Sequence, residues 1–300
     1  DAPRAWARLG PGWPNAEASR FVRAGGVAWH VQRMGPGGAP PILLLHGAGG
    51  ASHSWRDVMP LLAAEAEVIA PDLPQHGFSS APAGGRQSMP AMARALGALL
   101  AALDARPALI VGHSAGAAVA LRMVLDGHAA PGAVVGFNAA LAPFRGLAGL
   151  LFPPTAKLLA LNPASPWVFS SVVGGRQQAR RLIEGTGSTI DRRGLDCYRA
   201  LFGRSDHVSG ALTMMANWDL RPLRADLWRL ETPTLLVVGL GDRAVPPDEA
   251  RRLAAAHDAI RYAEVAGAGH LLHEERPGEA AAAILDVLRG RELGEVPGAG

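Results

Sequence analysis

The pentapeptide Gly-His-Ser-Ala-Gly at residues 112–116 constrains the fold of this chain more than any other feature. An apolar run at 108–111 precedes it and is typical of a buried strand, whereas the small and apolar residues of 115–125 are typical of a helix. A strand, a tight turn around a serine and a helix make the context in which GxSxG forms a nucleophile elbow. Glycines on both sides would let the strand and helix approach closely and hold Ser114 in a strained, exposed turn. A Gly/Ser turn without a function is the alternative, and the flanking elements favour the elbow.

A serine hydroxyl becomes a nucleophile only when a base accepts its proton, and the chain offers both a base and an acid beyond the elbow. The apolar run 234–238 leads into a loop that carries Asp242, and the run 260–265 ends in a flexible loop that carries His270. We expect Ser114, Asp242 and His270 to form a catalytic triad in which the carboxylate orients the imidazole. An aspartate that caps a helix and a histidine in solvent are the alternative.

A carbonyl attacked by serine becomes an oxyanion, which needs hydrogen-bond donors that are already in place. The run 42–45 predicts a buried strand, and the glycine-rich segment 46–50 follows it directly. We assign the oxyanion hole to the backbone N–H groups of Ala48 and Ala115, and we expect His46 to shape the loop. A flexible glycine loop is the alternative. A phosphate loop is disfavoured, because the lysine and hydroxyl residue of that motif are missing.

Composition excludes several classes of protein. The chain has 300 residues, 49% of them hydrophobic, which is enough for one large core. Its net charge is only +3, and the densest basic cluster, Arg176, Arg180 and Arg181, predicts a solvated helix face and no nucleic-acid binding. The single cysteine, Cys197, excludes an internal disulfide framework and favours a cytoplasmic location. We expect no secretory signal and no integral membrane segment, whereas reversible contact with a membrane surface stays open.

The order of apolar runs predicts an α/β fold with a mostly parallel, twisted sheet covered by helices on both faces. Two strands, at 21–23 and 27–34, form an antiparallel start to the sheet. Further strands are expected near Ile42, Val68, Leu109, Val134, Leu235 and Tyr262. They alternate with helices expected at 52–64, 88–103, 115–125, 248–256 and 277–288.

One segment, 142–212, interrupts this alternation with short helix-like pieces and no convincing strand. We expect a helical cap there, which divides the chain into a first core part at 1–141, the cap at 142–212 and a second core part at 213–300. Its apolar residues exceed what a connection needs, so a bulky apolar ligand is favoured over a sugar. Packing against the body is the alternative for each of them.

Residues near the predicted site supply the candidates for substrate binding. These are His46, Gly47, His53, Trp55, His113, Phe152, Trp167, Asn217 and Trp218. Helix packing is an equal alternative for His53 and Trp55, and His113 is expected to pack beside the sheet. Asn217 could instead cap the next helix together with Asp219, which is also the second choice for the acid of the triad.

A metal site is the least favoured reading of the histidines. His270 and His273 have an HxxH spacing beside Glu274 and Glu275, which could place both imidazoles on one helical face. Zinc motifs need further ligands in register, and none is evident. We therefore expect no metal and no organic cofactor.

The loops described above resemble those of the α/β-hydrolase superfamily over nearly the whole chain. Serine, aspartate and histidine follow one another in the order of that superfamily, and the segment 72–77, Asp-Leu-Pro-Gln-His-Gly, matches a characteristic turn except at Gln75, where glycine is usual. A closer resemblance, to the BchO family of magnesium-chelatase accessory proteins of bacteriochlorophyll biosynthesis, lies in residues 12–15, 20–22, 29–33, 53–57 and 214–220. This resemblance implies the α/β-hydrolase fold, tetrapyrrole metabolism and a functional link to magnesium chelatase, but it supplies no reaction.

Because elbow, acid, base and oxyanion loop are all present, we expect a serine hydrolase that cleaves an ester of a bulky apolar substrate through an acyl-enzyme. The resemblance points to a porphyrin-like substrate, and to the surface of the photosynthetic membrane as a second location beside the cytoplasm. The alternative is a binding protein that holds a tetrapyrrole for the chelatase and leaves the triad unused, because a fold and a motif do not by themselves establish turnover.

Overall fold

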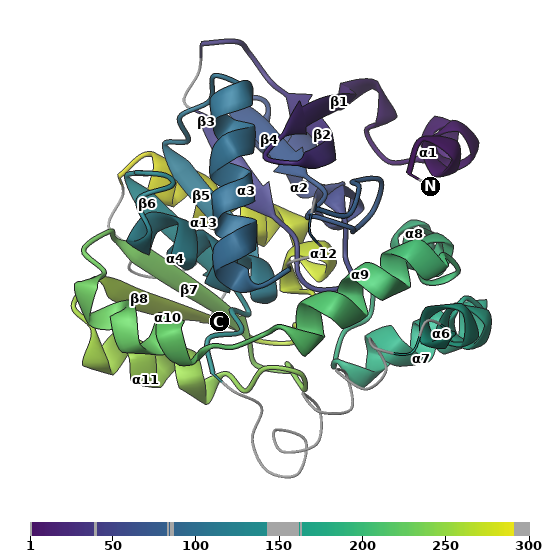
Figure 1. Ribbon diagram of the computed structural model, residues 1–300. Helices are drawn as coiled ribbons and strands as arrows, with labels where there is room; N and C mark the ends of the chain where they lie inside the picture. Colours follow the sequence, from purple (N-terminus) through teal and green to yellow (C-terminus); the bar gives the residue numbers. More distant parts are fainter. Residues whose placement is uncertain are drawn as a thin grey trace.

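An eight-stranded sheet forms the centre of the molecule (Figure 1). The computed structural model describes residues 2–38, 41–82, 84, 87–142, 162 and 164–290. The strands are β1 (Ser19–Ala24), β2 (Val27–Met34), β3 (Pro41–Leu45), β4 (Glu67–Pro71), β5 (Leu109–His113), β6 (Ala133–Phe137), β7 (Thr234–Gly239) and β8 (Ile260–Val265). Their order across the sheet is β1-β2-β4-β3-β5-β6-β7-β8.

The predicted mostly parallel sheet is confirmed. Strand β2 pairs antiparallel with β1 and with β4, and the pairs among β3 to β8 are all parallel. Every residue of β5 and β7 is buried, which explains why these strands are continuous apolar runs without polar alternation. The parallel arrangement places the carboxyl ends of β5, β7 and β8 at one edge of the sheet, and the predicted triad residues follow these ends.

Helices cover both faces of the sheet (Figure 1). They are α1 (Ala2–Leu9), α2 (Val58–Leu62), α3 (Met89–Ala102), α4 (Ala115–Leu125), α6 (Ser165–Val173), α7 (Arg176–Gly185), α8 (Arg192–Phe202), α9 (Ser205–Ala216), α10 (Arg221–Asp226), α11 (Asp248–Ala256), α12 (Leu272–Glu275) and α13 (Pro277–Leu288). Short 3₁₀ helices are η1 (Gly10–Gly12), η2 (Ala16–Ala18), η3 (Ser52–Trp55) and η4 (Leu227–Arg229). One apolar core lies under α3, α4, α10 and α11, and a second lies under α2 and α13.

The helical stretch predicted near 52–64 consists of two separate pieces. The structure has η3 (Ser52–Trp55) and, after a break at Arg56 and Asp57, the short helix α2 (Val58–Leu62). Pro60 explains the break, because proline has no N–H group and its ring clashes with the carbonyl four residues earlier in a helix interior. In the observed structure Pro60 lies in the first turn of α2, where no such partner is required.

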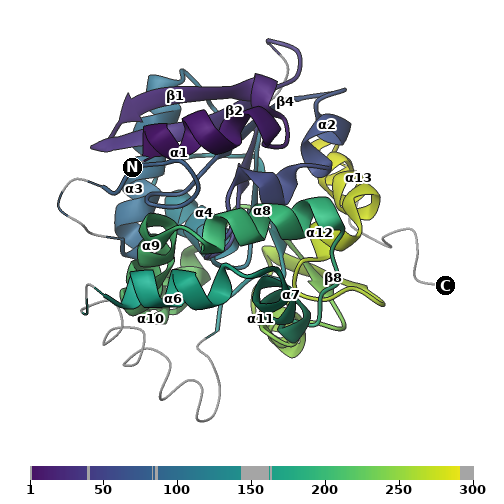
Figure 2. The same ribbon diagram turned by 90° about the vertical axis from the view of Figure 1, so that its right-hand side faces the viewer.

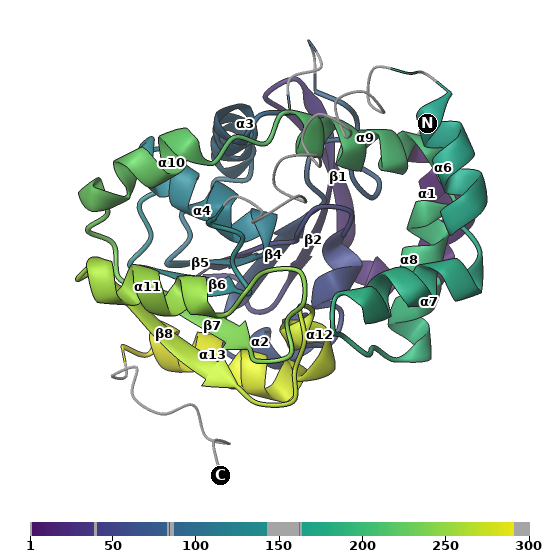
Figure 3. The same cartoon turned by 90° about the horizontal axis from the view of Figure 1, so that it is seen from below.

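The described part of the chain between β6 and β7 consists of helices and their connections. Helices α6, α7, α8 and α9 gather on one side of the molecule, as Figures 2 and 3 show from two directions. Their position is that of the predicted cap, although the boundaries at 142 and 212 stay a prediction. Phe152 lies outside the described residues. None of the described helices combines the length and the apolar character that a membrane span requires.

Two glycines allow β5, β3 and α4 to meet closely around Ser114. A Cβ atom on Gly112 would lie 2.4 Å from the backbone nitrogen of Ala117, and one on Gly116 would lie 2.4 Å from the carbonyl oxygen of Leu45. Real Cβ atoms do not approach backbone atoms so closely, so any larger residue would push α4 away from the sheet. Ser114 itself has a φ of 50°, a conformation that is rare for residues other than glycine.

We therefore expect Gly116→Ala to lower the free energy of unfolding by about 1–3 kcal/mol, the usual cost of forcing an extra carbon into a packed site. Urea unfolding measures this change. Gly278→Ala in α13 is the matched control, because its new Cβ would have no heavy atom within 4 Å. It should leave the stability unchanged or slightly raised, since alanine favours a helix. Equal stabilities of the two variants would contradict the prediction.

Candidate active site

Ser114, His270 and Asp242 form one chain of hydrogen bonds. His270 Nε2 lies 3.1 Å from Ser114 Oγ, and His270 Nδ1 lies 2.8 Å from Asp242 Oδ2. Since an ionised carboxylate only accepts, Nδ1 carries the proton that it donates to Asp242. The other ring nitrogen then has a free lone pair toward the serine hydroxyl, which is the arrangement of a general base.

Asp242 is held by four donors in a fully buried position. Its Oδ1 accepts the backbone N–H groups of Ala244 at 2.7 Å and Val245 at 2.8 Å. Its Oδ2 accepts His270 and the side-chain amide of Asn138, each at 2.8 Å. Sequence reasoning did not single out Asn138. Its only signal is an asparagine directly after strand β6, where a φ of 46° places it in the region that asparagine tolerates.

The glycine-rich loop after β3 passes directly beside the serine. A Cβ atom on Gly47 would lie 3.1 Å from Ser114 Cβ. Ala115 is the first residue of α4, so its N–H group is among those that the helix itself leaves free. Within the described residues, no backbone carbonyl accepts the N–H of Ala48 outside regular elements. Both donors that we assign to the oxyanion hole are therefore available, and their role stays a prediction.

His46 fixes the shape of this loop from inside the protein. Its Nδ1 donates to the carbonyl of Gly47 at 2.7 Å, and its Nε2 accepts the N–H of Leu73 at 2.8 Å. Burial lowers the pKa of His46, which keeps the imidazole neutral, as these two contacts require. The side chain is fully buried. These contacts give His46 the loop-shaping role expected from the sequence, and a contact with substrate stays a prediction.

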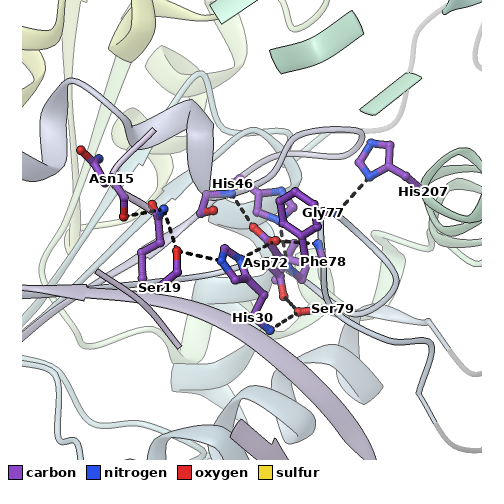
Figure 4. A network of polar contacts seen from close by, with 12 residues as sticks. Asn15, Ser19, His30, His46, Asp72, Gly77, Phe78, Ser79 and His207 are labelled. Carbon is purple, nitrogen blue, oxygen red and sulfur yellow. Dashed lines mark hydrogen bonds and ion pairs between the residues drawn. The ribbon is translucent and has the colours of Figure 1, made fainter. Parts of the chain in front are cut away.

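A second network, drawn in Figure 4, joins the loop to the strands behind it. Asp72 Oδ2 accepts His30 Nδ1 and the N–H of Phe78, each at 2.8 Å, while Oδ1 accepts the N–H of Ser52 at 2.7 Å. Burial raises the pKa of Asp72, but His30 and the hydrogen bonds outweigh it and hold this pKa well below its usual value. His30 Nε2 in turn lies 3.0 Å from Ser19 Oγ. Sequence reasoning did not single out this network.

His207 connects helix α9 to the oxyanion loop. Its Nδ1 accepts the N–H of Gly77 at 3.0 Å, and its Nε2 donates to the carbonyl of Gly49 at 3.0 Å (Figure 4 shows the contact with Gly77). Burial, together with the positive charge of Arg204, lowers the pKa of His207 to about 4. The ring is therefore neutral near pH 7 and able to accept and donate at once.

A buried ion pair connects helix α8 to the segment that follows His270. Arg56 donates to Glu274, and it also contacts Asp191 Oδ1 at 2.8 Å. Glu274 Oε1 accepts the hydroxyls of Ser54 and Tyr198, each at 2.7 Å. Burial raises the pKa of Glu274, and the charge of Arg56 opposes this shift. These contacts hold α8, η3 and α12 together.

The connection between α7 and α8 is bonded to both catalytic loops. The carbonyl of Thr186 accepts the N–H of Arg243 at 3.0 Å, directly after the acid. Ser188 Oγ accepts the N–H of Leu271 at 2.8 Å, directly after the base. Helices far from the sheet therefore help to set the distance between the carboxylate and the imidazole.

Three substrate-binding candidates lie inside the protein. His53 and Trp55 are fully buried, and Trp55 packs against the ring of Phe137. Both ring nitrogens of His53 lack a hydrogen-bond partner among the described residues, and the substrate contact expected for these two side chains stays a prediction. His113 is also buried, and its Nε2 donates to the carbonyl of His270 at 2.9 Å. Burial lowers the pKa of His113 well below its usual value. This side chain positions the catalytic loop.

The candidates on the later part of the chain lie elsewhere. Trp167 is exposed on α6, and Trp218 packs partly buried against the core. Asn217 donates to the carbonyl of Thr213 at 2.7 Å and so closes the end of α9. Asp219 is exposed and pairs with Arg221 at 2.8 Å, so the second choice for the acid is excluded by its contacts.

His273, the second histidine of the HxxH spacing, is hydrogen-bonded to a serine. Its Nε2 lies 2.7 Å from Ser54 Oγ, and burial lowers its pKa well below the usual value. In the part of the chain that the structure describes, no group of three or more His, Cys, Asp or Glu side chains is arranged to hold a metal ion.

Comparisons with known proteins show the family and the fold. The model of the "Alpha/beta hydrolase family" matches residues 42–284. The "Magnesium-chelatase 30 kDa subunit" of Rhodobacter capsulatus is 41% identical over 96% of this chain and 99% of its own length. "Epoxide hydrolase A" of Mycobacterium tuberculosis is 30% identical over 93% of this chain and 99% of its own length. An alpha/beta hydrolase fold protein from Burkholderia ambifaria has a TM-score of 0.74 at 23% identity and covers 90% of this chain and 97% of its own. The predicted fold class and the predicted family resemblance are confirmed.

We expect the protein to lose stability as the pH falls from 6.5 toward 4, because His207 has a pKa of about 4 when folded and an ordinary value of 6.5. Between these two pH values His207 binds a proton in the unfolded chain but not in the folded protein. The contribution of His207 to stability is therefore complete above pH 6.5 and is lost as the pH falls toward 4. This group alone accounts for about 3 kcal/mol.

Urea unfolding at a series of pH values measures the loss. His207→Gln should make the free energy of unfolding less dependent on pH over this range. The matched control is His257→Gln at the partly exposed end of α11, which should follow the wild type. Identical pH profiles for wild type and His207→Gln would contradict the assignment.

Proposed function

We propose that this chain, which belongs to the alpha/beta hydrolase family, is a serine hydrolase that cleaves an ester of a bulky apolar substrate. The observation that carries the proposal is the chain of contacts from Asp242 through His270 to Ser114, at 2.8 and 3.1 Å. The serine stands at a strained turn beside a glycine-rich loop with free N–H groups, which is where acyl transfer needs both its nucleophile and its oxyanion donors.

In the proposed reaction His270 Nε2 accepts the hydroxyl proton while Ser114 Oγ bonds to the carbonyl carbon of the ester. The carbonyl oxygen gains the negative charge, and the N–H groups of Ala48 and Ala115 stabilise it. The bond from carbon to the alcohol oxygen then breaks, and the imidazolium gives its proton to the leaving alcohol. Water, deprotonated by the same imidazole, then bonds to the carbonyl carbon of the acyl-enzyme. The bond from this carbon to Ser114 Oγ breaks, the imidazolium returns the proton to Oγ, and the acid leaves, while Asp242 keeps the ring oriented.

The substrate class rests on a relative and on the sequence. A protein named "Magnesium-chelatase 30 kDa subunit", aligned with 96% of this chain, supports a tetrapyrrole ester as the bulky apolar substrate. The same name supports a functional link to magnesium chelatase. A cytoplasmic location is part of the proposal and rests on the single cysteine, Cys197, which is buried.

The name of this relative also favours a second candidate function. The chain would bind a tetrapyrrole for magnesium chelatase and leave the serine unused. This candidate differs from the first in one measurable property, since it requires tight binding of a porphyrin but no reactivity of Ser114.

A fluorophosphonate probe separates the two candidates. We expect one probe per chain on Ser114, located by peptide mass spectrometry, and no labelling of Ser114→Ala. Ser19→Ala is the matched control, because Ser19 also contacts a histidine that pairs with an aspartate, His30 with Asp72, and should label like the wild type. An unlabelled wild type that binds a porphyrin tightly would refute the hydrolase and support the binding protein.

The two aspartates near the site provide a second test. Asp242→Asn should lower kcat for a soluble ester by about 10⁴-fold with little change in KM, because the imidazole loses the partner that fixes its tautomer. Asp219→Asn removes only an exposed pair with Arg221 and should leave kcat within about twofold, as surface ion pairs contribute little. A similar loss in both variants would argue against Asp242 as the acid.

A further inference from the structure

Helix α6 carries its apolar side chains on the outside. Its inward positions are Ser170 and Val173, both buried. Its exposed apolar side chains are Trp167 at 67%, Val168 at 51%, Phe169 at 39% and Val172 at 60% exposure. A helix on the surface of a globular protein normally turns its apolar stripe inward. Among the described residues nothing covers these side chains, and a large exposed apolar face is typical of a site that contacts a partner or a membrane.

The surroundings of this face are basic. The nine residues of α6 include no charged side chain, whereas α7, beside it, carries Arg176, Arg180 and Arg181. From 165 to 216 the chain has seven arginines and four acidic residues. The pairs Arg176 with Asp196 and Arg180 with Glu184 are exposed, so water screens them and their arginines can exchange partners. Figure 2 shows α6, α7 and α8 on the same side of the molecule, with α1 next to them.

We propose that α6 docks this protein on the surface of an anionic lipid bilayer. The side chains of Trp167, Phe169 and Val172 enter the boundary between headgroups and acyl chains, where tryptophan is favoured. The arginines of α7 contact the lipid phosphates around them.

Charge decides between a bilayer and a second copy of the chain as the occupant. Two copies joined through this face would bring the basic surroundings of one against those of the other, which is repulsive. An anionic bilayer offers negative headgroups to the arginines of α7 and an apolar layer to the exposed side chains of α6.

Docking would orient the proposed active site toward the lipid. Helix α6 belongs to the same group as α9, whose His207 contacts the oxyanion loop at Gly49. A substrate that partitions into the bilayer would then reach the protein from the side on which α6 to α9 lie (Figure 3). This inference goes beyond the proposed reaction, because docking does not require Ser114 to react.

Co-sedimentation of the full chain with vesicles tests the proposal, using phosphatidylcholine with and without phosphatidylglycerol. We expect binding to the anionic vesicles, at least about tenfold weaker binding to the neutral ones, and release at high salt. The double variant Trp167→Ser with Phe169→Ser should weaken binding by at least about tenfold, because both rings lose their place in the lipid. Arg180→Gln with Arg181→Gln should weaken binding to anionic vesicles only.

Trp228→Ser is the matched control, since Trp228 in η4 is 77% exposed but lies outside α6, and it should bind like the wild type. The proposal fails if the wild type binds no vesicles or if the α6 variant, Trp167→Ser with Phe169→Ser, binds them normally. It fails as well if Trp228→Ser weakens binding as much as the α6 variant. It also fails if light scattering shows a dimer that the α6 variant abolishes. Ser114→Ala should still bind, so this test and the fluorophosphonate test fail independently.

Discussion

The close packing of α4 against the ends of β3 and β5 determines where the reactive hydroxyl stands. Gly112 and Gly116 allow it, and the price is a positive φ at Ser114, a conformation that costs energy in a residue with a side chain. Surrounding contacts hold the turn in place, among them the bond from the N–H of Ser114 to the carbonyl of Phe137 at 2.9 Å. The strain therefore persists, and the hydroxyl projects from a rigid element toward the loops after β7 and β8.

Hydrogen bonds alone do not make a catalytic site, because the molecule contains two hydrogen-bonded groups of serine, histidine and aspartate. Ser19, His30 and Asp72 are joined at 3.0 and 2.8 Å, much like the triad at the elbow. Here, however, the imidazole is fully buried and the ring of Phe78 lies edge-on to it. The group formed by Ser114, His270 and Asp242 differs because it lies beside a glycine-rich loop with available N–H donors. The catalytic assignment therefore rests on the hydrogen bonds of Ser114, His270 and Asp242 together with this loop.

Features with a local cause could be predicted from the sequence, and those that depend on distant partners could not. The strands, the elbow motif and the order of acid and base follow from apolar runs and glycines. Asn138 was missed because an asparagine after a strand has many uses, and only the fold brings it to Asp242. Arg56 and Glu274 were missed because a buried pair 218 residues apart leaves no periodic signal. The break at Arg56 and Asp57 has a local cause, Pro60, which marks the first turn of a new helix.

Buried contacts join most of the helices α6 to α9 to the loops around the site. Helix α8 is held by Arg56 and Glu274, and breaking such a buried pair costs about 3–5 kcal/mol. Helix α9 is held by His207, and the connection between α7 and α8 is bonded at Ser188. By contrast, α6 buries little besides Val173. Among the described residues α6 packs mainly against α9, and its side chains form no hydrogen bond with the loops that carry Asp242 and His270. A bilayer in contact with the apolar side chains of α6 would therefore leave these two loops in place.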